Sequence, residues 1–300
     1  MSILFRAAGV EDTYATFKVF QQSIMDLSQR LGVMAVTGGQ DPAVVEHLWE
    51  RRRSMFEHLA RTAEHFWLAE KDQAVIGYAR SIARDGVREL TDFFVLPGEQ
   101  SAGVGRELLT RAFPADGATH RLIVSTIDAR AFVRYLKSGV YPRFPSYYFS
   151  RAPEPISMIT DLSYEPISAS PESLDALGML DKAVLGYRRD VDHAWLLENR
   201  RGYLYYRGSQ PVGYGYVGSS NGPFAMLDGD DFPAVLAHAE REAVDGGYEF
   251  GVEVPMINRT AVNYLLARGF RLDSFFAFVM SDAPFGKFEN YIFTSPPFFA

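Results

Sequence analysis

The chain has 300 residues, enough for two domains, and its 47% hydrophobic and 22% charged residues are typical of folded globular proteins. It has no cysteine, which excludes disulfides, thiolate nucleophiles and cysteine-based zinc sites. A net charge of −7 argues against nucleic-acid binding, and no apolar run has membrane-spanning length, so we expect a cytoplasmic protein with no nucleic-acid or membrane partner.

Strands and helices alternate along the first half. Apolar periodicity, hairpin turns and helix-ending glycines define these elements. In chain order they are a strand at 3–7, helical segments at 10–31 and 42–62, a hairpin over 67–78, a strand at 91–96, a helix at 106–113, a strand at 122–127 and a helix over 128–139.

A glycine-bearing turn joins the strand at 91–96 to the helix at 106–113 and reads Gln100-Ser101-Ala102-Gly103-Val104-Gly105-Arg106. Such a turn presents free backbone N–H groups beside the positive end of the helix dipole, an arrangement suited to a pyrophosphate. Glycines let the backbone approach the phosphate oxygens closely. The spacing fits neither a Rossmann fingerprint nor a P-loop, and an ordinary glycine turn is the alternative.

The second half repeats the first. Asp128-x-x-Ala131-x-x-x-Tyr135-x-x-x-Gly139 matches Asn258-x-x-Ala261-x-x-x-Leu265-x-x-x-Gly269 at a constant offset, since 258 − 128 and 269 − 139 both equal 130. The hairpin over 67–78 matches one over 203–214, and helical segments over 171–200 precede the second hairpin. The two halves are therefore expected to share one plan.

The expected fold is α/β, with a mixed, mostly antiparallel sheet flanked by helices in each copy. Proline-rich residues after 151 indicate an extended linker, and the apolar tail is expected to dock on the body or on a second subunit. The predicted boundaries are a first domain at 1–151, a linker at 152–159, a second domain at 160–285 and a docked tail at 286–300.

The loop V-x-P-x-x-Q-x-x-G-x-G resembles the acyl-CoA loop of the GNAT superfamily of N-acyltransferases, and the duplication resembles a tandem GNAT protein. The resemblance implies that acetyl-CoA or another acyl-CoA is the cofactor. It also implies that the strand pairs with the pantetheine arm through its backbone. The residues implied to bind the cofactor are Phe94, Val95, Leu96, Gln100, Ser101, Ala102, Gly103, Val104, Gly105, Arg106, Asp128 and Ala131.

The resemblance also implies the catalytic groups. Tyr135 stands where GNAT enzymes often hold a tyrosine near the thioester sulfur, and a phenol suits a general acid for a departing thiolate. Glu89 is the expected base for the acceptor amine, with Asp92 or a water chain as alternatives. Strict strand alternation predicts that Glu89 and Asp92 point to opposite faces. The histidines show no paired ligand spacing, so no metal site is expected.

The loop of the second copy has lost these features. At the offset of 130, Gln100 and Ser101 become Asp230 and Asp231, and the two glycines become Pro233 and Val235. Two carboxylates repel a pyrophosphate, and proline removes an N–H donor. The second copy is therefore expected to be degenerate, acting as a scaffold that walls the acceptor pocket.

The resulting hypothesis is an acyl-CoA-dependent N-acyltransferase that acts on a primary amine of a small molecule or peptide, with a homodimer left open. One alternative is a CoA-binding sensor without turnover. Another is acylation of a cysteinyl sugar amine, as in the mycothiol-synthase branch, although that branch is described as using the C-terminal copy. A tandem aminoacyl transferase of the peptidoglycan type is a third.

Overall fold

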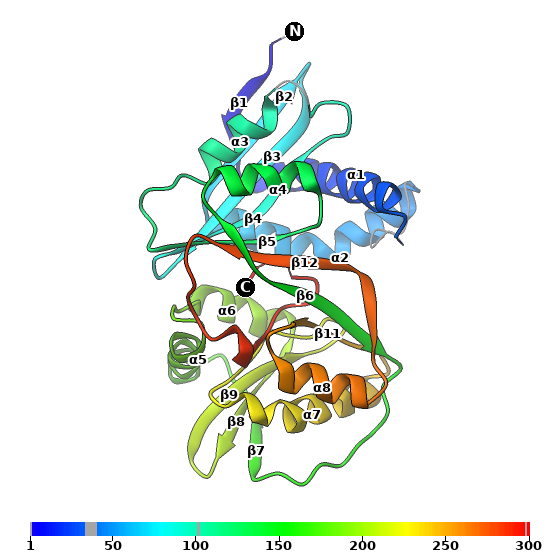
Figure 1. Cartoon of the computed structure of the whole chain (residues 1–300), viewed down its shortest axis with the longest axis vertical. Coiled ribbons are helices and arrows are strands. Elements are labelled where there is room, and N and C mark those ends of the chain that lie inside the picture. Colours follow the sequence, from blue (N-terminus) through cyan, green and yellow to red (C-terminus); the bar gives the residue numbers. More distant parts are fainter. Residues whose placement is uncertain (1, 34–40, 101–102, 298) are drawn as a thin grey trace. The chain divides into compact units, whose positions relative to one another are not determined.

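The computed structural model describes residues 2–33, 41–100, 103–297 and 299–300 (Figure 1). The chain divides into two compact units. Unit 1 comprises Met1–Ile123 and Asp128–Val140, and unit 2 comprises Val124–Ile127 and Tyr141–Ala300. Across the described ranges, every helix falls short of the length and apolarity that a membrane span requires.

Unit 1 is built on a mixed sheet with the order β1-β2-β3-β4-β5. Its strands run antiparallel except for β4 and β5, which are parallel. This arrangement agrees with the mixed, mostly antiparallel sheet expected from the sequence. Its elements are β1 (Leu4–Ala7), α1 (Thr13–Leu31), α2 (Pro42–Arg61), β2 (Ala63–Lys71), β3 (Ala74–Arg84), β4 (Val87–Val95), α3 (Val104–Ala112), β5 (His120–Ser125, which begins in this unit) and α4 (Ala129–Lys137).

Helices cover both faces of this sheet. Phe94 on β4 meets Phe20 of α1 edge to face, with ring centroids 5.2 Å apart. The adjacent Phe93 meets Tyr135 of α4, with centroids 5.9 Å apart. Because successive strand residues point to opposite faces, α1 lies on one face of β4 and α4 on the other.

Local signals set the helix ends in unit 1. Asp41 accepts a hydrogen bond from the Ala43 N–H at 2.9 Å and caps α2, and Gly32 ends α1 in the left-handed conformation. The helical segment predicted at 10–31 starts with a 3-10 turn (Val10–Asp12) before α1. The other predicted elements differ by a few residues at their ends, as frayed termini usually do.

Unit 2 contains a five-stranded antiparallel sheet with the order β13-β10-β9-β8-β7, and β6 lies separately between β11 and β12. Its elements are β6 (Tyr141–Arg151), β7 (Leu162–Pro166), α5 (Pro171–Val184), α6 (Asp190–Asn199), β8 (Arg201–Arg207), β9 (Gln210–Val217), β10 (Phe224–Met226), α7 (Phe232–Gly246), β11 (Phe250–Pro255), α8 (Arg259–Ala267), β12 (Arg271–Ser281) and β13 (Tyr291–Ile292).

Strand β6 belongs to unit 2, whereas the predicted domain boundary at 151 places it in the first domain. It is the last strand of the first repeat by sequence, yet it pairs antiparallel with β11 and with β12 of the second repeat. The compact units therefore separate at 140 and not at 151. Sequence periodicity identifies the strand but carries no information about which copy supplies its neighbours.

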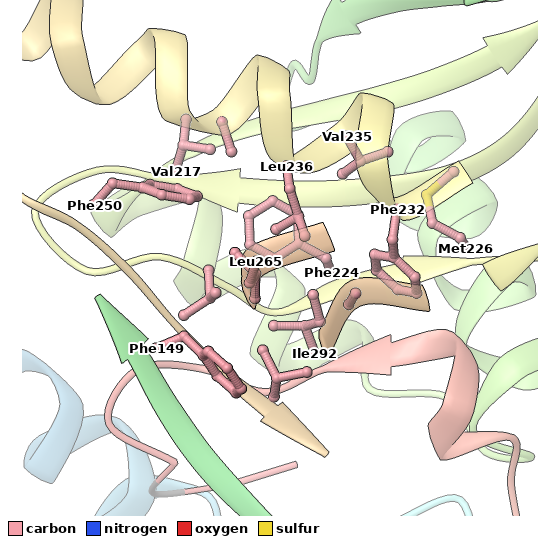
Figure 2. Close-up of a cluster of buried hydrophobic side chains, with 14 of the residues drawn as sticks. Phe149, Val217, Phe224, Met226, Phe232, Val235, Leu236, Phe250, Leu265 and Ile292 are labelled. Carbon is pink, nitrogen blue, oxygen red and sulfur yellow. The ribbon is translucent and has the colours of Figure 1, made fainter. Parts of the chain in front are cut away.

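The core of unit 2 is a cluster of buried side chains from α7, α8, β6 and the sheet (Figure 2). Phe149 of β6, Leu236 of α7 and Leu265 of α8 are each fully buried in it. Ile292 of β13 joins the same cluster. The apolar C-terminal tail is therefore docked within unit 2.

Candidate active site

The glycine loop leads directly into α3. Gly103 has φ = 78° and is the N-cap residue of α3, with no side chain capping the helix. Glycine is required because a side chain strains this left-handed conformation. Among the described residues, no side chain caps the first N–H groups of α3, an arrangement that suits an anion. Ser101 and Ala102 lie outside the described residues.

Gly105 serves close packing. A Cβ atom at this position would lie 3.1 Å from Cζ of Phe93 and 3.3 Å from Nε of Arg134. Both distances are tighter than ordinary contacts, so a larger residue would force the Phe93 ring and the Arg134 side chain to shift. The sequence suggests phosphate approach as the reason for this glycine, whereas the structure shows a packing reason. Val104, between the two glycines, is buried.

The resemblance assigns residues 94–96 to pantetheine, and in this segment one residue has backbone groups that point away from β3. The Leu96 N–H donates to the Ile76 carbonyl on β3 at 2.8 Å. Because backbone groups alternate in direction along a strand, those of Val95 point away from β3. The Val95 carbonyl accepts hydrogen bonds from Gln100 Nε2 at 3.0 Å and from Ser23 Oγ at 3.5 Å.

Two arginines surround Asp128, the N-cap residue of α4. Its carboxylate accepts from the backbone N–H of Arg130 at 2.9 Å, from Arg130 Nη2 at 2.8 Å and from Arg30 Nη2 at 2.9 Å. Burial opposes ionisation, but these hydrogen bonds lower the pKa of Asp128 to about 2. The carboxylate is thus ionised and neutralised, so it presents little net negative charge to an anionic cofactor.

Arg130 also connects α4 to the loop, because its guanidinium donates to the Gln100 side-chain carbonyl. Arg106 on α3 is 75% exposed, and its nearest carboxylate, Glu107, is 3.7 Å away. Ala131 lies half-buried on α4, one turn before Tyr135. The loop side of unit 1 therefore carries several guanidinium groups beside the helix end.

Tyr135 is 5% exposed and sits on α4 behind Phe93. Burial, and secondarily the charge of Asp128, raises the pKa of Tyr135 above its ordinary value. The phenol is therefore protonated at neutral pH.

The two candidate bases share one face of the sheet. In the pairing of β3 with β4, Glu89 lies opposite Ile82 and Asp92 lies opposite Arg80, which leaves Thr91 as an extra residue. Directly paired residues point to the same face, and Ile82 and Arg80 share a face. The bulge at Thr91 thus corrects the prediction of opposite faces, because an inserted residue resets the alternation.

Asp92 is occupied by a buried ion pair. Its carboxylate accepts from Arg80 at 2.9 and 2.6 Å, from the Tyr78 hydroxyl at 2.9 Å and from the Thr91 hydroxyl at 2.9 Å. Arg80 in turn donates to the Phe56 carbonyl at 3.0 Å. Both carboxylate oxygens are engaged, so Asp92 serves the fold, whereas Glu89 is buried two residues before the bulge.

Sequence reasoning missed Arg30, Arg130 and Arg134, which lie around the loop. Arg130 and Arg134 stand on the helix that carries Tyr135, so their spacing from Asp128 could have suggested them. Arg30 comes from α1, 98 residues before Asp128 in the chain. Such a long-range contact leaves no local trace in the sequence.

Comparison with solved structures shows where this fold occurs. A proposed acetyltransferase from Pyrococcus horikoshii aligns over 96% of this chain and 92% of its own, with a TM-score of 0.73 and 15% identity. A GCN5-related N-acetyltransferase from Sphaerobacter thermophilus aligns over 93% and 95%, with a TM-score of 0.60 and 14% identity. A tandem GNAT protein from the clavulanic acid biosynthesis pathway aligns over 94% and 99%, with a TM-score of 0.57 and 12% identity.

These likenesses establish a shared two-copy fold. Comparison with curated protein sequences gives no match. The decisive observation is that residues 34–134 match the model of the acetyltransferase (GNAT) family. The segment 34–134 is therefore similar to a GNAT domain. GNAT domains use acetyl-CoA as the acyl donor, so this similarity supports a transferase of the N-acetyltransferase type with acetyl-CoA as its cofactor.

Proposed function

We propose that the chain transfers an acyl group, most simply acetyl, from CoA to the primary amine of a small molecule or peptide at one site in its first half. The observation that carries this proposal is the pairing of an uncapped helix end at Gly103 with a buried, protonated Tyr135 on the neighbouring helix. The first feature suits the pyrophosphate, and the second suits the leaving sulfur.

The proposed reaction is direct transfer. The neutral acceptor amine attacks the thioester carbonyl, a C–N bond forms and the C–S bond breaks. The outward N–H of Val95 stabilises the developing oxyanion, and Tyr135 protonates the departing thiolate. The proton lost by the amine passes to Glu89 or to water. Asp92 is not proposed as the base, because donors already engage both of its oxygens.

The second copy is proposed to act as a scaffold. Its loop lies in the turn before α7, where the Asp231 carboxylate accepts from Arg207 Nη2 at 2.7 Å. The Asp228 side chain accepts from the N–H of Asp230 at 3.0 Å. Carboxylates of the chain thus stand at this helix end, and they disfavour an external phosphate.

Release of CoA from acetyl-CoA across a panel of primary amines tests the proposal. Tyr135→Phe removes only the hydroxyl, so we expect kcat to fall by about 10²-fold or more, while the KM for acetyl-CoA changes little. Tyr141→Phe alters an exposed tyrosine and is the matched control. Unchanged kcat in Tyr135→Phe would remove the proposed acid.

A further inference from the structure

The C-terminal tail forms a buried strand in unit 2. In β13, Tyr291 and Ile292 pair antiparallel with β10, with Ile292 opposite Phe224 and Tyr291 opposite Ala225. On the other side, the Phe293 N–H donates to the Glu253 carbonyl of β11 at 3.0 Å. The tail therefore runs between β10 and β11 and bonds to both.

The repeat shows what this position corresponds to in the first copy. At the offset of 130, the strand residues assigned to pantetheine, 94–96, become 224–226, which is β10. Ile123 of β5 becomes Glu253 of β11. The tail thus pairs with the residues that correspond to the pantetheine-binding strand of the first copy.

Besides β10 and β11, the start of α8 also contacts the tail. Asn258 stands at the position of Asp128, at the start of α8. Its Nδ2 donates to the Tyr291 carbonyl at 3.2 Å, while its Oδ1 caps α8 by accepting from the Ala261 N–H at 3.0 Å. In this copy, the motif asparagine therefore binds a peptide carbonyl of the chain itself.

The side chains of Tyr291 and Ile292 make buried contacts that hold β13 in place. The Tyr291 hydroxyl accepts from Arg189 Nη1 at 3.0 Å, and Arg189 is held by Asp181 in a buried ion pair. Ile292 lies among Phe224 and Leu265 in the core cluster (Figure 2). Tyr291, Ile292 and Phe293 are all fully buried.

The tail also contacts the degenerate loop. Asn290 Nδ2 donates to the Leu227 carbonyl at 2.8 Å, and Asn290 Oδ1 lies 3.0 Å from the position that a Cβ of Gly229 would take. Leu227 and Gly229 correspond to positions 97 and 99 of the first copy. The residues before β13 thus cover the start of the second loop.

We propose that residues 290–293 replace the pantetheine arm of CoA in the second copy, so that this copy holds a peptide strand of its own chain as a fixed structural ligand. The inference rests on the proposed function in one respect, namely that pantetheine pairs with 94–96 in the first copy. An attached strand has a high effective concentration, so free CoA does not displace it. The chain then binds one CoA.

Two measurements test this proposal. The first is calorimetric titration of the full chain with CoA, with one equivalent expected. For the second, a protease site is inserted between Gly286 and Lys287, both exposed. After cleavage, we expect the fragment 287–300 to co-elute with the body in gel filtration and to separate only in denaturant. Excess CoA is expected to leave the fragment in place.

Asn258→Asp sharpens the second measurement. Aspartate keeps the helix cap, as Asp128 does in the first copy, but it removes the donor to the Tyr291 carbonyl. We expect an excess of a synthetic, labelled peptide of residues 287–300 to replace the bound fragment about 10-fold faster in the cleaved variant than in the cleaved parent. Asn199→Asp, at an exposed asparagine whose Nδ2 donates to the Trp195 carbonyl of its own helix, is the control.

Two equivalents of CoA, displacement of the fragment by CoA, or a fragment that separates freely in buffer would each overturn the inference. A full chain that binds no CoA at all would instead refute the proposed function, while the fragment and peptide measurements would still decide the role of the tail. If Asn258→Asp fails to fold, the cleaved parent with and without CoA still gives the answer.

Discussion

Glu89 and Asp92 point to the same face of the first sheet, because the extra residue Thr91 resets the alternation between them. Both carboxylates are buried, and the proposed function assigns them different roles. Asp92 is bound by Arg80 and Tyr78 in the interior. Substitutions at the two positions should therefore have different consequences.

Asp92→Ala should destabilise the protein strongly. It leaves the Arg80 guanidinium buried without its carboxylate, and breaking a buried pair typically costs about 3–5 kcal/mol. Glu57→Ala is the control, because Glu57 pairs with exposed Arg53 and Arg61 and should cost less than about 1 kcal/mol. Urea unfolding measures both, and equal losses would contradict the assignment of Asp92 to the fold.

Glu89→Gln should lower the rate of transfer without unfolding the protein. If Glu89 takes the proton of the amine, kcat should fall by about 10²-fold at neutral pH, with the KM for acetyl-CoA unchanged. Steady-state kinetics with an amine found in the panel, together with circular dichroism of the variant, measure this. A variant that keeps the parent rate would assign the proton to water.

Gly103→Ala should raise the KM for acetyl-CoA. The residue has φ = 78°, so alanine strains the loop by about 1 kcal/mol and displaces the first N–H groups of α3. Gly32→Ala is a matched control, because Gly32 has φ = 66° with nothing within 4 Å of its added Cβ, and it ends α1. Both variants should lose stability, but only the first should bind acetyl-CoA more weakly.

Glu253 should make the stability of unit 2 depend on pH. It is 6% exposed, and burial raises its pKa to about 8. The folded state therefore keeps the proton at pH values where the unfolded chain has released it, so stability falls as pH rises from about 4.5 to 8 by up to ~1.4 kcal/mol per unit. Glu253→Gln should flatten this decline in urea unfolding at pH 6 and 8. If stability still fell with pH at the same slope in Glu253→Gln, Glu253 would not be the source of the decline.

Local signals in the sequence predict much of this fold. The offset of 130 residues identifies the duplication, and the loop at Gly103 lies in the segment 34–134 that matches the GNAT family model. The bulge at Thr91 escapes prediction, because one inserted residue leaves the apolar pattern intact while it changes which side chains share a face. The arginines around Asp128 escape it because Arg30 comes from a distant helix.

The C-terminal tail likewise has one feature that the local sequence predicts and one that it does not. Its apolar residues predict that it docks, but only the pairing of Ile292 with Phe224 shows where. Similarly, the sequence of β6 identifies a strand, whereas its partners on β11 and β12 lie roughly 100 to 140 residues further along the chain. Pairings at this separation depend on the complete fold, which local periodicity does not encode.

The position of β6 between β11 and β12 has a consequence for biosynthesis. At roughly 5–20 residues per second, a ribosome needs roughly 5–20 seconds to pass from the end of β6 to the start of β11. During that interval the aromatic strand Tyr141–Arg151 has been synthesised, but neither of its neighbouring strands has. Nascent chains stalled in this window should be the ones that recruit chaperones or aggregate.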